Sequence, residues 1–143
     1  MKDLILITGS VMTADKDSVE RYEKLISMID VEKYDVSSPL DTMKFQGTDE
    51  ERFNRAISML ANTRMMIAEM SSVSTGQGIE IGIASTMNIP ILVIAKEGSK
   101  VSGLVKGCKT VKGVVYYENI EDIKEELDKF IGGKDEEYNN HRR

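Results

Sequence analysis

Residues 68–94 read AEMSSVSTGQGIEIGIASTMNIPILVI, and this stretch decides the fold. It begins at the end of one apolar run, passes through a loop rich in Ser, Thr and Gly, and enters an amphipathic segment with one acid, Glu80. It finishes in a second apolar run at residues 91–94. This order predicts a strand, a glycine-rich turn, a helix and a strand, the unit that builds a nucleotide pocket in open parallel sheets.

Apolar runs with β-branched members recur along the chain and predict strands. They lie at residues 4–7, 34–36, 65–67, 91–94 and 113–117. Apolar residues three and four positions apart predict helices between them. These helices begin after Asp15 or Asp17, after Thr48 and after the loop 71–78, with a short helix at 102–105 and a last one at 119–131. Residues 40–48 show no clear period and are predicted to be a loop.

Strands that alternate with helices predict a three-layer α/β fold, flavodoxin- or Rossmann-like, with a doubly wound, parallel, five-stranded sheet. Right-handed crossovers favour the strand order 2-1-3-4-5. In that order the ends of strands 1 and 3 are neighbours, so Gly9, Ser10 and the loop 71–78 converge on the switch point where ligands bind. We expect a single domain over residues 1–131 and a polar, flexible tail over residues 132–143.

Composition narrows the classes of function. The chain has 143 residues, of which 41% are hydrophobic and 30% charged, as is typical of one soluble domain. Its apolar runs are far shorter than the ~20 residues of a membrane span, and we expect neither a membrane partner nor a signal peptide. A net charge of −5 without a basic cluster argues against an extended nucleic acid as partner.

The scarcity of cysteine and histidine has two consequences. Cys108 is the single cysteine, so no internal disulfide can form and a cytoplasmic location is expected. His141 is the single histidine, which leaves no set of ligands for a zinc site and no histidine-based triad. We therefore expect neither a metal nor a cofactor.

The loop 71–78 contains four hydroxyl residues and two glycines, Gly76 and Gly78. Glycines allow close approach of a ligand to the backbone or a positive φ, and hydroxyls at a helix start suit a phosphate. The loop is neither a Walker motif nor a dinucleotide fingerprint, because no Lys follows the last Gly and a third spaced Gly is missing. A tight turn whose Ser or Thr caps the next helix explains the pattern equally well.

Glu80 is a lone acid among apolar and small residues. We place it in the first turn of the predicted helix, where the dipole keeps a carboxylate ionised. An ionised, oriented carboxylate beside a phosphate site can attack a sugar carbon as a nucleophile. The alternative is a helix-start Glu that only complements the dipole.

Three segments carry a resemblance to a known family. They are Ala68-Glu69, Gly78-Ile79-Glu80-Ile81-Gly82 after the Ser-containing loop, and Asn88-Ile89-Pro90-Ile91-Leu92. They resemble the nucleoside 2-deoxyribosyltransferase superfamily, and within it the 2'-deoxynucleoside 5'-phosphate N-hydrolases, whose motif reads A-E, G-x-G-[YI]-E-L-G and K/N-x-P. The likeness runs from the first strand to the final helix and is most specific at residues 68–92.

The resemblance implies roles for individual residues. In that family the motif Glu attacks C1' and releases the base, which implies this role for Glu80. Serines of the N-hydrolase branch hold the 5'-phosphate, and one of them reaches across a dimer interface. The resemblance thus implies substrate contacts at Gly9, Ser10, Ser74, Gly76, Gly78 and Ser102. It also implies a nucleotide substrate and a homodimer in which Ser102 completes the neighbouring site.

The chain departs from the family pattern at three positions. The family Asp on the helix before strand 3 aligns with Ala56, whose polar neighbours are Asn54, Arg55 and Ser58. The family Tyr in the first strand is Leu6, and the phosphate-binding Arg after Gly-Ser is Met12. The identity of the general acid is therefore open, and the candidates are Glu69, Asp41 or a group of the substrate.

Three functions remain compatible with these residues. The first is an N-glycosidase that hydrolyses the base–sugar bond of a (deoxy)nucleoside 5'-monophosphate through a glycosyl-enzyme at Glu80. The second is a 2-deoxyribosyltransferase that exchanges bases. The third is a nucleotide-binding module with little or no catalysis, which the departures at Leu6 and Ala56 leave open. The serines aligned with phosphate contacts favour the first.

Overall fold

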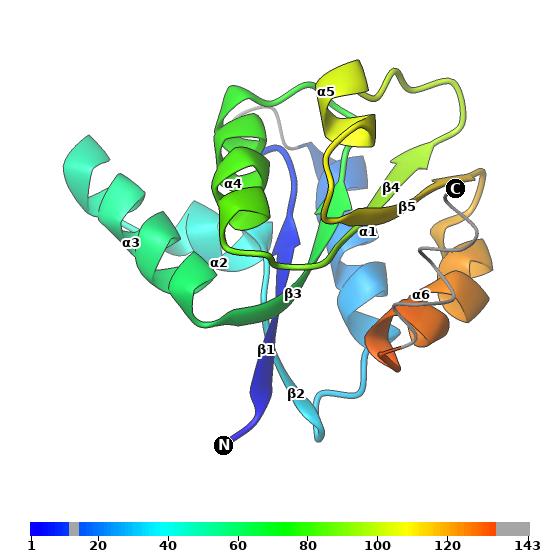
Figure 1. The fold of residues 1–143 in the computed structure, drawn as a ribbon, viewed down its shortest axis with the longest axis horizontal. Coiled ribbons are helices and arrows are strands. Elements are labelled where there is room, and N and C mark those ends of the chain that lie inside the picture. The colour runs from blue at the N-terminus through cyan, green and yellow to red at the C-terminus, as the bar shows by residue number, and fades with distance from the viewer. Residues whose placement is uncertain (12–14, 134–143) are drawn as a thin grey trace.

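The computed structural model describes residues 1–11 and 15–133, which form a five-stranded parallel sheet of order β2-β1-β3-β4-β5 (Figure 1). The predicted fold class and strand order are confirmed. The strands are β1 (Asp3–Thr8), β2 (Tyr34–Ser37), β3 (Thr63–Glu69), β4 (Ile91–Lys96) and β5 (Val111–Tyr117). Because all pairs are parallel, the strands end at one edge of the sheet, and residues that follow them can meet there.

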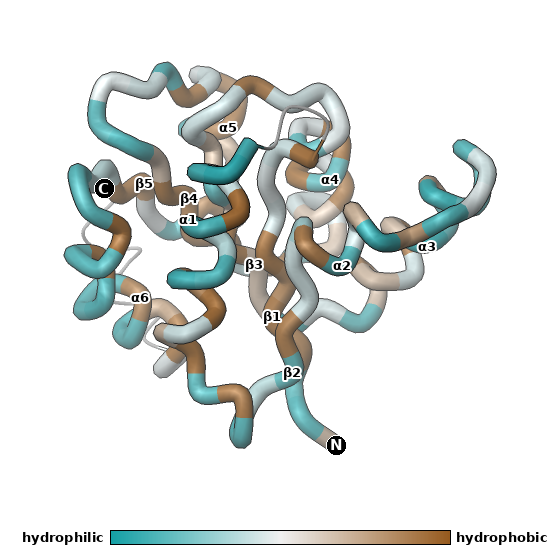
Figure 2. The backbone as a smooth tube through the Cα atoms, turned by 180° about the vertical axis from the view of Figure 1, so that it is seen from behind, coloured by the Kyte–Doolittle hydropathy of each residue, from teal (hydrophilic) through white to brown (hydrophobic). Residues whose placement is uncertain are grey.

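Helices cover both faces of the sheet (Figure 1). One face packs against α1 (Lys16–Ser27), the 3₁₀ turn η1 (Ile120–Ile123) and α6 (Lys124–Ile131). The last two, η1 and α6, take the place of the single closing helix predicted at 119–131. The other face packs against α3 (Asp49–Ala61), α4 (Thr75–Thr86) and α5 (Gly103–Lys106). Figure 2 shows the result from behind, with hydrophobic central strands and hydrophilic residues along the outer helices.

Successive strand residues supply the two cores in turn. Ile5 and Ile7 lie in the core beneath α1 and α6, whereas Leu6 between them lies in the core beneath α3 and α4. The same alternation runs along β3 and β4, because side chains of a strand point to opposite faces. A strand buried on both faces reads as a continuous apolar run, which is why the apolar runs predicted these strands correctly.

The loop predicted at residues 40–48 is wrong. Residues Pro39–Lys44 form a helix, α2, that sequence periodicity missed because it has only 6 residues and one buried member, Pro39. Its start is marked by a capping box: Leu40 N donates to the Ser38 hydroxyl, and Ser38 N donates to the Asp41 carboxylate. Proline at the first helical position adds a second start signal.

Helix α3 leaves the body of the molecule at its N-terminal end (Figure 1). Thr48 and Glu51 form its capping box, and Leu60 near its other end is buried. The helix predicted after Thr48 is present, but Phe53 in its first half is 53% exposed. No helix within the described residues is long and apolar enough to cross a membrane.

Candidate active site

A cavity of about 70 Å³ lies where β1 and β2 end, between α2, α3 and α4. Backbone and side chains of the first strand form its floor, and Glu80 of α4 is its one described carboxylate. Ser37 and Thr42 add hydroxyls from the β2 end and α2, while Arg52 and Arg55 come from α3. The cavity thus combines one acid with two cations at the sheet edge where open α/β folds bind ligands.

Glu80 does not lie in the first turn of its helix, as the sequence suggested. Helix α4 begins at Thr75, so Glu80 occupies the second turn, beyond the reach of most of the helix dipole. Burial in the cavity raises the pKa of Glu80 to about 7, and the positive charge of Arg55 opposes part of that rise. The expectation of a carboxylate kept ionised by the helix start is therefore wrong, and the residue instead titrates near neutral pH.

The cavity contains two of the three positions at which the chain departs from the family pattern. Leu6 and Ala56, aligned with the family Tyr and Asp, line it together with Glu80. The third position, Met12, lies outside the described residues. Both of these departures place an apolar side chain in the cavity that contains Glu80.

Neither acid named as a candidate proton donor lines this cavity. Asp41 accepts the backbone N–H of Ser38 in the α2 capping box. Glu69 is 2% exposed and accepts hydrogen bonds from the Ser71 hydroxyl, the Ser71 N–H and the Tyr117 hydroxyl. Each carboxylate is thus occupied in holding the structure.

Gln77 is a site residue that the sequence did not reveal. It is 1% exposed, and its side-chain nitrogen donates to Thr8 Oγ1 at 3.1 Å and to the Glu69 carbonyl oxygen at 3.0 Å. One amide thereby ties the start of α4 to the ends of β1 and β3. Glu80 lies three residues further along α4, on the same side of the helix as Gln77. Only its position between Gly76 and Gly78 could have drawn attention to it.

Gly9 and Ser10 lie at the end of β1 as predicted, and Gly9 lines the cavity. Ser10 is 5% exposed, and its carbonyl oxygen accepts the hydroxyl of the buried Tyr22 at 2.8 Å. A Cβ on Gly9 would lie 2.3 Å from that hydroxyl oxygen. The glycine is therefore required by the packing of Tyr22, which holds the loop in place.

Replacing Gly9 by alanine should lower the free energy of unfolding by about 1–3 kcal/mol, the usual cost of overpacking. The added methyl group would push against the Tyr22 ring, which is 1% exposed and cannot swing outward without losing its packing. Urea denaturation measures the change. Gly82→Ala is the matched control, because a Cβ on this helical glycine meets nothing within 4 Å and should cost no stability. Equal effects of the two substitutions would contradict this account of Gly9.

The loop 71–78 has the capping role that the sequence offered as one of two explanations. Ser74 is the N-cap of α4, and its hydroxyl accepts the Gln77 N–H at 3.3 Å. Gly76 and Gly78 have no positive φ, so a special backbone conformation does not explain them. A Cβ at either position would meet nothing within 4 Å. Because neither glycine has a side chain, the outer side of the first turns of α4 is uncovered backbone.

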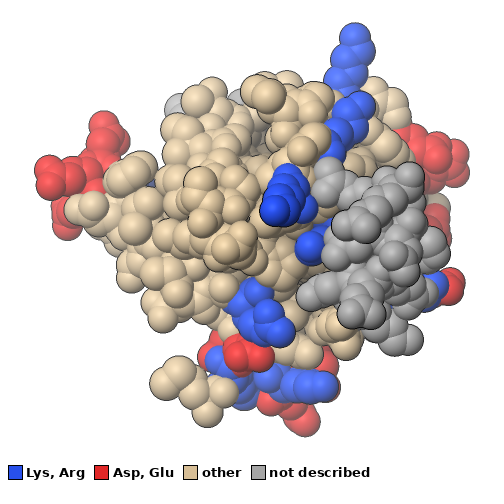
Figure 3. All heavy atoms as spheres, viewed as in Figure 1, with Lys and Arg blue, Asp and Glu red and all other residues tan. Residues whose placement is uncertain are grey.

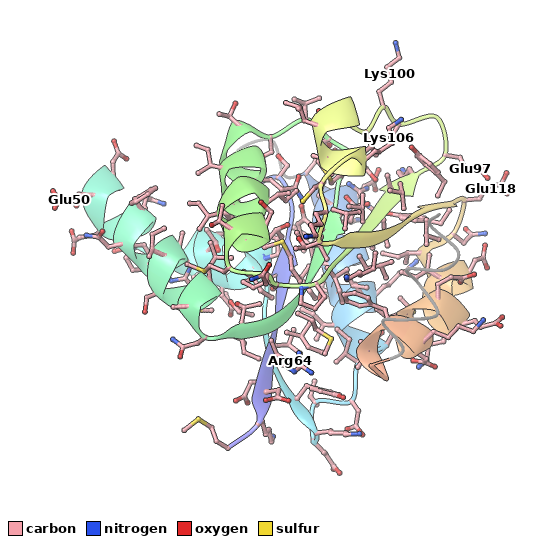
Figure 4. The ribbon with its side chains drawn as sticks, in the orientation of Figure 1. Glu50, Arg64, Glu97, Lys100, Lys106 and Glu118 are labelled. Carbon is pink, nitrogen blue, oxygen red and sulfur yellow. The ribbon has the colours of Figure 1, made fainter. Side chains whose placement is uncertain are left out.

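Ser102 does not line the Glu80 cavity. It caps the short helix α5, where its hydroxyl accepts the Leu104 N–H at 3.2 Å. Two exposed lysines flank it, Lys100 and Lys106, both at the α5 end of the molecule (Figure 4). Within the described residues, the structure therefore brings Glu80, Gly9, Ser10 and the loop 71–78 to one region of the sheet edge and leaves Ser102 on an outer surface.

A larger cavity, about 260 Å³, opens on the other face of the sheet, beside α1 and the end of β5. It mixes four acids with Arg21, Lys24 and Lys96, and the pair Lys24–Glu121 closes one side at 3.1 Å. Arg21 also approaches a carboxylate outside the lining, Glu69, at 3.9 Å. The described residues contain no cluster of three or more His, Cys, Asp or Glu side chains that could hold a metal.

Comparison with known proteins gives both curated relatives and solved structures. No family model matches the sequence. Two curated proteins carry the name "Putative 2'-deoxynucleoside 5'-phosphate N-hydrolase 1". The one from Methanosarcina barkeri is 33% identical over 79 residues, 54% of this chain and 50% of that protein, so this match spans half the relative's length. The one from Methanosarcina mazei is 28% identical over 137 residues, 91% of this chain and 84% of that protein.

Solved structures show the same fold. The Clostridium botulinum CMP N-glycosidase superposes with a TM-score of 0.68 at 19% identity, over 87% of this chain and 97% of its own. The 2-deoxyribosyltransferase of Bacillus psychrosaccharolyticus does so with a TM-score of 0.66 at 13% identity, over 85% and 90%. In sequence the chain is thus similar to proteins named 2'-deoxynucleoside 5'-phosphate N-hydrolase, and in fold to a solved N-glycosidase and a solved 2-deoxyribosyltransferase, which supports its resemblance to the nucleoside 2-deoxyribosyltransferase superfamily.

Proposed function

We propose that the protein is an N-glycosidase that hydrolyses the base–sugar bond of a (deoxy)nucleoside 5'-monophosphate. The observation that carries the proposal is Glu80, the one carboxylate among the described residues that line the cavity at the switch point. The names of the curated relatives and of the superposed glycosidase support the reaction class. The serine-rich loop beside the cavity supports a phosphorylated substrate.

The reaction would proceed in two displacements at C1'. A Glu80 oxygen attacks C1', the bond from C1' to the base nitrogen breaks, and its electron pair leaves with the base. Water then attacks C1' of the glycosyl ester, the bond to Glu80 breaks, and the water proton is released. The products are the free base and the sugar 5-phosphate, and the Glu80 carboxylate is restored.

The 5'-phosphate would lie over the start of α4. The cavity of about 70 Å³ is smaller than a nucleotide site of roughly 300–1,000 Å³, so the substrate has to extend beyond it. The open surface at Gly76 and Gly78 would admit a phosphate close to the helix, with Ser10 and Ser74 as its proposed contacts.

Incubation with a panel of ribo- and deoxyribonucleoside 5'-monophosphates tests the proposal directly. Free base, separated by chromatography, should appear without any added acceptor. Release from a monophosphate but not from its nucleoside would support the phosphate contacts. Base exchange between unphosphorylated nucleosides would favour a deoxyribosyltransferase instead, and binding without turnover would favour a module that only binds nucleotides.

We further propose that two copies of the chain form a dimer through α4 and α5. Four apolar side chains project from this face and its adjoining loops: Val73, Ile79, Met87 and Leu104, which are 92%, 50%, 41% and 90% exposed. In Figure 3 the surface over α4 is largely uncharged, with lysines toward the right. In such a dimer Ser102, with Lys100 and Lys106 beside it, would reach the phosphate bound by the other subunit.

Replacing Leu104 by glutamate should weaken this dimer at least about 30-fold, the equivalent of a 2 kcal/mol hot spot. A buried charge without a partner would oppose association, and activity per subunit should fall with the dimer population. Light scattering over a dilution series measures the proportions of monomer and dimer. Val31→Glu is the control, because Val31 is 54% exposed beyond α1 and far from this face. A Leu104→Glu protein that stays dimeric would place the interface elsewhere.

A further inference from the structure

The charge of the Glu80 cavity is unusual for a glycosidase site. Its described lining contains one carboxylate and two guanidinium groups, Arg52 and Arg55, but no other Asp or Glu and no His, Lys, Cys or Tyr. A guanidinium does not give up its proton in proteins. Among the described residues, the lining therefore supplies positive charge beside Glu80 but no acidic group able to protonate a leaving base.

Arg55 is the better held of the two cations. One of its terminal nitrogens donates to Thr42 Oγ1 at 3.3 Å, and its guanidinium carbon lies 5.3 Å from the centre of the Phe45 ring. Both partners belong to α2 and its C-cap, the helix fixed by the Ser38 capping box. Arg55 is half-buried, whereas Arg52 is exposed. The short helix α2 thus serves to aim one guanidinium into the cavity.

The first displacement makes a demand that Glu80 cannot meet. When the bond from C1' to the base breaks, the base carries away the electron pair and becomes an anion unless it receives a proton. Glu80 is the nucleophile in that step and cannot also be the acid. A fixed guanidinium can instead bind the anion with two parallel N–H donors, as it binds a carboxylate.

We propose that Arg55 is a catalytic residue that receives the departing base, which leaves as an anion hydrogen-bonded to the guanidinium. This inference rests on the proposed N-glycosidase function. The electron pair of the broken bond stays on the base, Arg55 keeps its proton, and water protonates the base after it has left. Water attack on the glycosyl ester supplies the balancing proton to solvent, so the sum is nucleotide plus water giving base and sugar 5-phosphate.

The inference names the preferred class of substrate. A base that leaves as an anion departs faster when its N–H is more acidic, because the negative charge is then better delocalised. Among pyrimidine nucleotides, uracil bases with two ring carbonyls should leave faster than cytosine. An electron-withdrawing substituent on uracil should accelerate release further, in the order 5-methyl, unsubstituted, 5-fluoro.

The experiment measures kcat for base release from this series of 2'-deoxyuridine 5'-monophosphates, with wild-type protein, Arg55→Ala and Arg55→Lys. Wild type should show a rate that rises with the acidity of the base. Arg55→Ala should lower kcat for the unsubstituted nucleotide by about 10²–10³, the usual effect of losing one charge-stabilising donor. The factor by which Arg55→Ala lowers kcat should shrink as the base becomes more acidic. Arg55→Lys should recover part of the rate, because it retains the charge without the fork.

Arg64→Ala is the matched control. Arg64 lies at the start of β3, away from α4, and pairs with Asp3 at 4.0 Å (Figure 4). Its replacement should leave kcat unchanged, and circular dichroism establishes that each variant is folded. If wild type releases base but Arg55→Ala lowers kcat by the same factor for every base, the role of Arg55 is overturned and the proposed function stands. A wild-type rate independent of base acidity would do the same, whereas no base release from any nucleotide would overturn the proposed function itself.

Discussion

Glu80→Gln should abolish base release, with kcat lowered at least about 10³-fold, because the amide has the shape of the acid but cannot form the glycosyl ester. The cavity offers no other carboxylate among its described residues, so no neighbouring group can take over the attack. Glu97→Gln is the control. Glu97 is exposed just after β4, away from the cavity (Figure 4), and its replacement should leave kcat unchanged.

The pH dependence of wild-type kcat provides a second measurement on the same residue. Only the ionised carboxylate attacks C1', and burial raises the pKa of Glu80 to about 7. Below that pH, kcat should therefore fall about tenfold per pH unit. Measurement at saturating nucleotide removes the titration of the free substrate phosphate from the profile. A rate already constant from pH 5 upward, or a Glu80→Gln protein as active as wild type, would exclude Glu80 as the nucleophile.

The sheet was the most predictable part of the molecule. Its strands are apolar runs buried on both faces, as in Ile91 to Ile94, and such runs carry their own signal. Once the order of strands and helices is known, right-handed crossovers leave few topologies, so the strand order followed. The short helix α2 was not predicted, because the Ser38 cap and Pro39 specify it rather than any hydrophobic period.

The candidate site was predictable only where a motif carried it. The sequence predicts Glu80 as a site residue because it is a lone acid in a distinctive motif, but its raised pKa depends on burial that no linear pattern records. Gln77 was missed, because its role comes from contacts with Thr8 and Glu69 across three elements. Arg55 was noted only as a neighbour of Ala56, and its position in the cavity depends on α2, the helix that had been read as a loop.

Glu80→Gln should also stabilise the protein at alkaline pH. The pKa of Glu80 rises from an ordinary 4.5 to about 7 on folding, so the folded state binds the proton more tightly than the unfolded chain. The free energy of unfolding contributed by this group is present below about pH 4.5 and is lost as pH rises through about 7. Glutamine carries no proton to lose. Above pH 8 the variant should thus be more stable than wild type by up to about 3 kcal/mol, at 1.4 kcal/mol per pKa unit.

Urea denaturation at pH 8.5 and pH 4.5 measures this difference, which should vanish at the lower pH. Glu97→Gln corrects for the removal of one negative charge from a chain of net charge −5. A gain of the same size at both pH values would show that glutamine merely packs better, and no gain at pH 8.5 would show that the carboxylate is well solvated. A pH-dependent gain, together with lost turnover, would mean that the fold holds Glu80 in the cavity at a cost in stability. The same burial that raises its pKa leaves its charge poorly solvated, which makes the ionised form a stronger nucleophile.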